Sequence, residues 1–102
     1  MRVYISGSIT NDPNHKEKFE RAQELLEQKG FIAVNPAKLP LDPEHFTHAE
    51  FMEIDKVLLG MCDAIYLLPG WKESEGALIE YKWAVAANKK VLKGRKEQQH
   101  EH

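Results

Sequence analysis

Short apolar runs that alternate with longer amphipathic segments constrain the fold of this chain more than any other feature. The short runs are rich in β-branched and aromatic residues, which is typical of strands. The longer segments repeat apolar residues at three- and four-residue spacing, which is typical of helices. We expect four strands, at residues 2–6, 31–35, 63–68 and 90–92. We expect one helix in each of the three intervals between them.

Local signals mark the ends of the predicted helices. Each helix is preceded by residues that commonly cap helices: Asn11-Asp12-Pro13, Thr47 with Glu50, and Ser74. Gly30 ends the first helix, and the third is expected to run to about residue 88. Residues 36–46 contain three prolines, so we expect a loop there.

The order βαβαβαβ predicts an α/β fold, because such alternation builds a parallel sheet with helices on both faces and right-handed crossovers. We expect a three-layer Rossmann-like or flavodoxin-like sandwich with strand order 2-1-3-4. We place a single domain at residues 1–93 and expect a polar, disordered tail at residues 94–102. Ligands of such sheets bind outside the carboxyl ends of the strands, where the strand order reverses. Here that point lies between the first and third strands.

Composition narrows the classes of partner. The chain has 102 residues and a formal net charge of −2, which argues against a nucleic-acid-binding protein with a large basic surface. A small anion remains compatible, because backbone N–H groups can hold one. One cysteine, Cys62, allows no intrachain disulfide, and no segment approaches the ~18 apolar residues of a membrane helix. We therefore expect a cytoplasmic protein that binds neither membranes nor nucleic acids.

Residues that follow the strands at the predicted binding edge are candidate ligand contacts. They are Gly7, Ser8 and Ile9 after the first strand, Asn35 and Pro36 after the second, and Trp71, Ser74 and Gly76 after the third. A glycine lets the backbone approach a ligand closely, and a helix N-terminus favours an anion. A plain strand-to-helix turn is the alternative reading of residues 7–9. The segment is not GxGxxG and has no Walker A lysine, so neither fingerprint applies.

Two carboxylates occupy helix positions where burial would be costly unless they are paired or used. Glu80 lies on a face of small residues, namely Gly76, Ala77, Ala84 and Ala87. Asp55 borders the predicted apolar stripe of the second helix, formed by Phe51, Ile54, Leu58 and Cys62. Both could be surface residues. Alternatively, they could act as the nucleophile and the acid or orienting group in cleaving a glycosidic bond.

Four other reactive side chains have plainer interpretations. Tyr4 lies within the first strand and is either a core residue or one that reaches the site. His45 and His48 could ligate a metal, but no carboxylate or cysteine pattern completes such a site. Cys62 precedes a buried strand and is interpreted as a core residue. No metal or cofactor is expected.

Three segments together resemble the nucleoside 2-deoxyribosyltransferase-like superfamily. They are YISGSI at residues 4–9, CDAIYLLPGW at residues 62–71 with Asp55 shortly before it, and SEGALIEYKWAVAANKKV at residues 74–91. The resemblance covers roughly residues 2–92. It points to a short bacterial and phage branch related to the 2′-deoxynucleoside 5′-monophosphate N-hydrolases.

The resemblance implies a reaction at C1′ of a deoxyribosyl group and a role for three residues. Glu80 would attack C1′, the base would leave, and water or a second base would resolve the covalent glycosyl-enzyme. Asp55 would contact the sugar hydroxyls or assist proton transfer, and Tyr4 would position Glu80. Trp71 could stack on the base or cover the core edge. The resemblance also implies a homodimer or a larger homo-oligomer and a nucleoside or nucleotide as the small-molecule partner.

Ser74 bears on the choice between a nucleoside and a 5′-monophosphate. It stands six residues before Glu80, where the resembling transferases carry an aspartate and the monophosphate hydrolases a phosphate-binding serine. Thr10 replaces the arginine of those hydrolases, and Glu73 and Glu75 would repel a phosphate. Two further hypotheses stay open: a non-catalytic nucleotide-binding module, and an interaction or oligomerisation subunit with apolar surface around Trp71 and Trp83.

Overall fold

The computed structural model describes residues 1–9 and 12–95 and contains one parallel sheet. Its strands are β1 (Arg2–Ser6), β2 (Ile32–Val34), β3 (Ala64–Leu67) and β4 (Lys90–Lys93). Their order across the sheet is β2-β1-β3-β4, as the sequence predicts. Strand β1 is central, with Tyr4 opposite Val34 on one side and Ile65 on the other. The strand order therefore reverses beside β1, where the site is expected.

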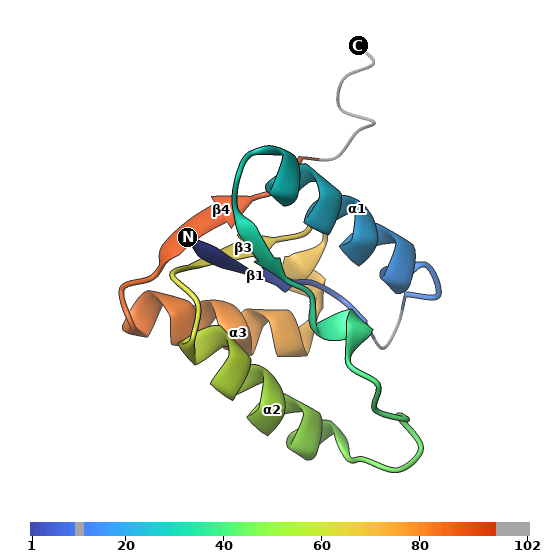
Figure 1. The fold of residues 1–102 in the computed structure, drawn as a ribbon. Helices are drawn as coiled ribbons and strands as arrows, with labels where there is room; N and C mark the ends of the chain where they lie inside the picture. The colour runs from blue at the N-terminus through green and yellow to red at the C-terminus, as the bar shows by residue number, and fades with distance from the viewer. Residues whose placement is uncertain (10–11, 96–102) are drawn as a thin grey trace.

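Helices cover both faces of the sheet, which confirms the three-layer fold (Figure 1). Helix α1 (His15–Gln28) lies on one face, and α2 (His48–Gly60) and α3 (Glu75–Ala86) lie on the other. Two short 3₁₀ turns, η1 (Pro36–Lys38) and η2 (Trp71–Glu73), complete the described elements. None of the helices that the structure describes is both long and apolar enough to cross a membrane.

Alternation along β1 divides the core into two clusters. Val3 and Ile5 pack with Phe19 and Leu26 on the α1 face. Tyr4 packs on the opposite face, in the cluster that α2 and α3 cover. Because successive side chains of a strand point to opposite faces, Ser6 lies on the same face as Tyr4. A tyrosine and a serine are thereby directed towards α3.

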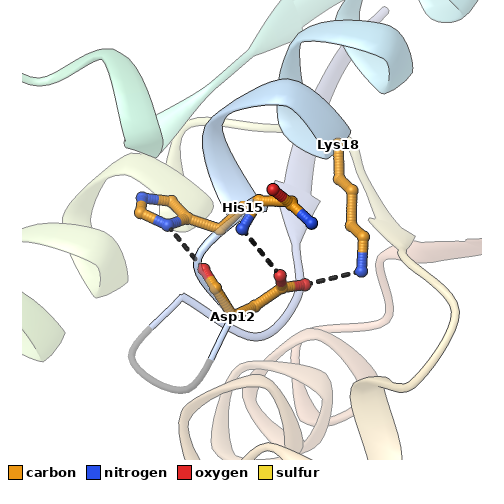
Figure 2. A network of polar contacts seen from close by, with 4 residues as sticks. Asp12, His15 and Lys18 are labelled. Atoms are coloured by element: carbon orange, nitrogen blue, oxygen red, sulfur yellow. Dashed lines mark hydrogen bonds and ion pairs between the residues drawn. The ribbon is translucent and has the colours of Figure 1, made fainter.

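The first helix starts later than predicted. Asn14 is its N-cap, without a side-chain hydrogen bond, and the helix begins at His15. Asp12 instead closes the preceding turn: its carboxylate accepts from the Asn14 backbone N–H at 2.9 Å and pairs with Lys18 at 2.7 Å (Figure 2). This bond forms an Asx turn ahead of the helix, because the N-cap position itself is occupied by Asn14. Asn11 lies outside the described residues, as does Thr10.

The other two helix starts are confirmed. Thr47 and Glu50 form the predicted capping box of α2. The Ser74 hydroxyl accepts from the Ala77 backbone N–H at 3.2 Å and caps α3. The third helix ends at residue 86, and Asn88 follows in the left-handed region with a φ of 59°.

The predicted apolar stripe of α2 is only partly buried. The most buried residues of this helix are Asp55 and Leu59, whereas Ile54 and Leu58 are only half-buried. Helix α2 packs mainly on α3. The inner face of α2 is therefore the face that contacts α3, and this is not its most apolar face. Cys62 itself is buried and free, as expected of a core cysteine.

Two loop expectations also change. The proline-rich segment contains η1, which Asn35 caps by accepting from the Ala37 backbone N–H at 3.0 Å. Gly94, the first residue of the predicted tail, continues the pairing of β4 with β3, because its N–H donates to the Leu67 carbonyl at 2.8 Å. The rest of the predicted tail, from residue 96, lies outside the described residues.

Candidate active site

A cavity of about 770 Å³ opens beyond the carboxyl end of β1. Its walls come from the end of β1, the segment after β2, and the first turns of the three α-helices. Nine residues predicted from the sequence line it: Tyr4, Gly7, Ser8, Ile9, Pro36, Asp55, Ser74, Gly76 and Glu80. A volume of this size is typical of small-molecule sites. The cavity also lies where ligands of open parallel sheets bind.

Glu80 lies at the floor of this cavity and is held by two hydroxyl groups. The Tyr4 hydroxyl donates to Glu80 Oε2 at 2.8 Å, and Ser6 Oγ donates to Glu80 Oε1 at 2.7 Å. All three side chains are buried, and that of Glu80 is 5% exposed. Both carboxylate oxygens therefore have a partner inside the protein. This arrangement resolves the two readings of Tyr4: it is a core residue that also contacts the predicted nucleophile.

Burial shifts the proton equilibria of the three interacting side chains. Burial, and to a smaller extent the neighbouring charge of Asp55, raises the pKa of Glu80 to about 8. The hydrogen bonds from Ser6 and Tyr4 lower this pKa but do not offset the effect of burial. Burial also raises the pKa of Asp55, while Glu80, Tyr4 and His48 oppose that rise. The pKa of Tyr4 lies well above its ordinary value because of burial and the two carboxylates. Perturbed carboxyl pairs in a cavity are typical of functional sites.

Two glycines lie at the walls of the cavity, and one of them, Gly7, is required by close packing. A Cβ on Gly7 would lie 2.8 Å from Leu68 Cδ1, so the end of β1 can contact the segment after β3 only with glycine there. A Cβ on Gly76 would lie 3.5 Å from Met52 Sδ and 3.9 Å from His48 Cε1. Both distances are ordinary van der Waals contacts, so α2 side chains lie against the first turn of α3 with room for a Cβ at position 76. Glu80 follows one turn later on the same helix face.

Two predicted contacts do not line the cavity. The Trp71 ring packs against Tyr81, with ring centroids 4.8 Å apart, and belongs to the core cluster on the α3 face. Of the two readings of Trp71, the structure supports the core-edge role. Asn35 caps η1, and its side-chain amide donates to Gln23 at 3.1 Å.

Several lining residues were missed by reasoning from the sequence. An apolar wall comes from the loop after β2 and from α2: Leu39, Leu41, Pro43, Phe46, Phe51 and Met52. His15, Lys16 and His48 add groups that can carry positive charge. Ser6, which contacts Glu80 but does not line the cavity, was also missed, although strand alternation places it on the Tyr4 face and could have indicated it. The apolar wall had no such signal, since its residues converge only through the path of a loop.

The histidine pair has no metal-binding geometry. His48 lines the cavity, whereas His45 does not and lies 4.0 Å from the Asp42 carboxylate. Within the described residues, no group of three histidine, cysteine, aspartate or glutamate side chains could hold a metal ion.

These features define an α/β protein with a parallel sheet of order β2-β1-β3-β4 and a buried carboxylate in the cavity beyond the sheet. The chain belongs to the family described as Domain of unknown function (DUF4406), whose model matches residues 1–93. A comparison with curated proteins finds no match.

Two solved structures are similar to this chain. A 2-desoxiribosyltransferase from Leishmania mexicana is 18% identical, with a TM-score of 0.70 over 90% of this chain and 62% of its own. A CMP N-glycosidase, BcmB, from Clostridium botulinum is 26% identical, with a TM-score of 0.62 over 91% of this chain and 70% of its own. The superfamily resemblance in the sequence is thereby confirmed for the fold. This chain spans less than two thirds of the length of the Leishmania protein.

Proposed function

We propose that this protein cleaves or transfers the N-glycosidic bond of a 2′-deoxynucleoside or 2′-deoxynucleotide, with Glu80 as the nucleophile. The observation that carries the proposal is the Glu80 carboxylate, buried at the floor of the cavity with a hydroxyl donor on each oxygen. Both similar structures are named for glycosyl chemistry, a transferase and an N-glycosidase. A fixed carboxylate beside a second one is the arrangement that glycoside cleavage with a covalent intermediate uses.

The two carboxyl groups divide the work. A Glu80 carboxylate oxygen bonds to C1′ while the C1′–N bond breaks, and the base leaves with that electron pair. Asp55, whose pKa burial raises, donates the proton that the leaving base takes up. Water or a second base then attacks C1′, its proton passes to Asp55, and the ester bond breaks to restore the Glu80 carboxylate.

The cavity carries features for and against a 5′-monophosphate. Ser74 lines it at the start of α3, and Lys16 adds a positive charge from α1. Glu75 also lines it and would repel a phosphate. A helix N-terminus favours an anion, and the name of the Clostridium protein specifies a nucleoside monophosphate. We therefore propose a monophosphate as the first substrate class to test and a nucleoside as the second.

A non-catalytic nucleotide-binding module is the second candidate, and one observation favours it. With the pKa of Glu80 raised to about 8, only about one molecule in ten carries the nucleophilic carboxylate at pH 7. A binding module does not require that charge.

Base release from a substrate panel tests the proposal. The protein is incubated with 2′-deoxynucleosides and their 5′-monophosphates at pH 7 and pH 8.5, with and without a free acceptor base, and products are separated by chromatography. We expect release from one class, which Glu80→Ala abolishes. Glu53→Gln is the matched control, because Glu53 is exposed on α2 outside the cavity, and it should leave release unchanged. No release at either pH contradicts the enzyme. Ligand-dependent melting shifts would then support the binding module.

A further inference from the structure

Strand β1 contacts the Glu80 carboxylate twice, through residues two positions apart. Tyr4 and Ser6 lie on the same face of β1, and strand geometry separates such positions by roughly 7 Å. The long tyrosine side chain reaches Glu80 Oε2, and the short serine side chain reaches Oε1. The carboxylate of α3 therefore bridges two hydroxyl groups whose spacing is set by the sheet.

We propose that Ser6 is a positioning residue for Glu80, which orients the carboxylate together with Tyr4 and keeps it reactive inside the protein. The effect of Ser6 on the rate of base release rests on the proposed function. Its effect on the pKa of the Glu80 carboxyl group is measured without any substrate.

Ser6 occupies a position where a hydroxyl group is costly unless it is used. The residue is 1% exposed, and its neighbours in β1 are the apolar Val3 and Ile5 and the hydrogen-bonded Tyr4. A buried hydroxyl without a partner destabilises a protein, so apolar residues are the usual occupants of such positions. The Ser6 hydroxyl donates to Glu80 Oε1 at 2.7 Å, which is shorter than the contact from Tyr4 to Glu80 Oε2.

Two oxygens held from one strand restrict the carboxylate more than one would. The terminal torsion of a glutamate side chain is broad, so a single hydrogen bond leaves the carboxylate plane free to turn. The second contact removes that freedom before a ligand arrives. Hydrogen bonds to the charged form also favour ionisation, and the bond from Ser6 lowers the pKa of Glu80 more than the bond from Tyr4 does.

Ser6→Ala tests this role, with Ser8→Ala as the matched control. Ser8 is two residues further along the chain and lines the same cavity, but donates no hydrogen bond to Glu80 in the structure. The Glu80 carboxyl carbon is titrated by ¹³C NMR in the unliganded protein, its signal identified by its loss in Glu80→Gln. We expect Ser6→Ala to raise the pKa of Glu80 by about 1 and Ser8→Ala to leave it in place.

Base release measured against pH separates this role from the proposed function. In Ser6→Ala we expect the pH of half-maximal release to move upward with the NMR pKa. An unmoved pKa and an unmoved rate profile in folded Ser6→Ala would overturn the positioning role while leaving the function intact. If the pKa of Glu80 moves in Ser6→Ala but the wild type releases no base, Ser6 positions Glu80 and the proposed function is wrong. If Ser6→Ala does not fold, the near-isosteric Ser6→Cys, a poor donor, must shift the pKa in the same direction or the proposal falls.

Discussion

Glu80 binds its proton more tightly in the folded chain than in the unfolded one. Burial raises its pKa from 4.5 to about 8. A carboxyl group with a raised pKa stabilises the folded state at low pH, and this contribution is lost as the pH rises through the folded-state value. The pH window of the loss therefore runs from about 4.5 to about 8.

Substituting Glu80 should reveal this loss directly. Glu80→Gln keeps an oxygen that accepts hydrogen bonds and cannot ionise. We expect it to match the wild type within about 1 kcal/mol at pH 4.5 and to exceed it by on the order of 4 kcal/mol at pH 9. Urea unfolding at both pH values measures the free energies of unfolding. A difference between variant and wild type that stays constant with pH would show that Glu80 ionises normally.

The protonation state of Glu80 should also govern catalysis, but here the ionised form is the favourable one. A nucleophilic carboxylate must be ionised, whereas Asp55 must hold the proton that it donates, so kcat/KM for base release is expected to rise as Glu80 ionises towards pH 8 and to fall at higher pH, where Asp55 has lost its proton. A rate that has already levelled off by pH 6 would contradict this dependence and point to a Glu80 that ionises below neutral pH.

The packing of Gly7 at the end of β1 leads to a separate prediction. Gly7→Ala would place a Cβ 2.8 Å from Leu68 Cδ1, so we expect a loss of about 1–3 kcal/mol in unfolding free energy. Gly60→Ala is the matched control, because a Cβ on this helical glycine meets nothing within 4 Å. It should be neutral or stabilising by up to about 1 kcal/mol. Equal effects of the two substitutions on thermal unfolding would contradict the packing argument.

At the scale of elements, the start of α3 combines a structural and a proposed functional role in Ser74. Its hydroxyl caps the helix, and it lines the cavity. Asparagine and aspartate cap helices as well as serine does, so Ser74→Asn and Ser74→Asp should keep stability within about 0.5 kcal/mol, whereas Ser74→Ala should lose about 1 kcal/mol.

The charge of Ser74→Asp should then separate the substrates. If a phosphate binds at this helix start, we expect Ser74→Asp to lower base release from the 5′-monophosphate at least tenfold relative to the nucleoside, and Ser74→Asn to change this ratio little. The comparison uses kcat/KM for both substrates in the three proteins. An unchanged ratio in Ser74→Asp would mean that no phosphate group lies near Ser74.

Helix α2 shows why apolar spacing alone misleads at this scale. Its sequence indicates a stripe through Ile54 and Leu58, yet Asp55 and Leu59 face inward. The inner surface of α2 packs against α3 and also lines a polar cavity. Because it lines the cavity, this surface carries a carboxylate where a helix that faces only the core would carry an apolar residue.

At the scale of the whole molecule, the superfamily resemblance predicts a homodimer or a larger homo-oligomer. Apolar side chains that such contacts use are exposed on and beside helices α2 and α3: Val57 on α2, Met61 directly after α2, and Val85 on α3. Light scattering after size exclusion should therefore give at least twice the chain mass of 11.7 kDa. A single-chain mass that persists at about 100 μM would contradict this prediction.

The sequence by itself determined the layered fold, the strand order and two of the three helix starts, and its family resemblance implied the pairing of Tyr4 with Glu80. These follow from local rules and recurring motifs: residue spacing, capping residues, and the handedness of crossovers. Only the tertiary structure decided that Ser6 shares the Glu80 carboxylate, that Asp55 faces inward, that an apolar wall closes the cavity and that Trp71 does not line it. Each of these depends on how separate elements approach one another, and packing between distant segments is not encoded in the spacing of any one of them.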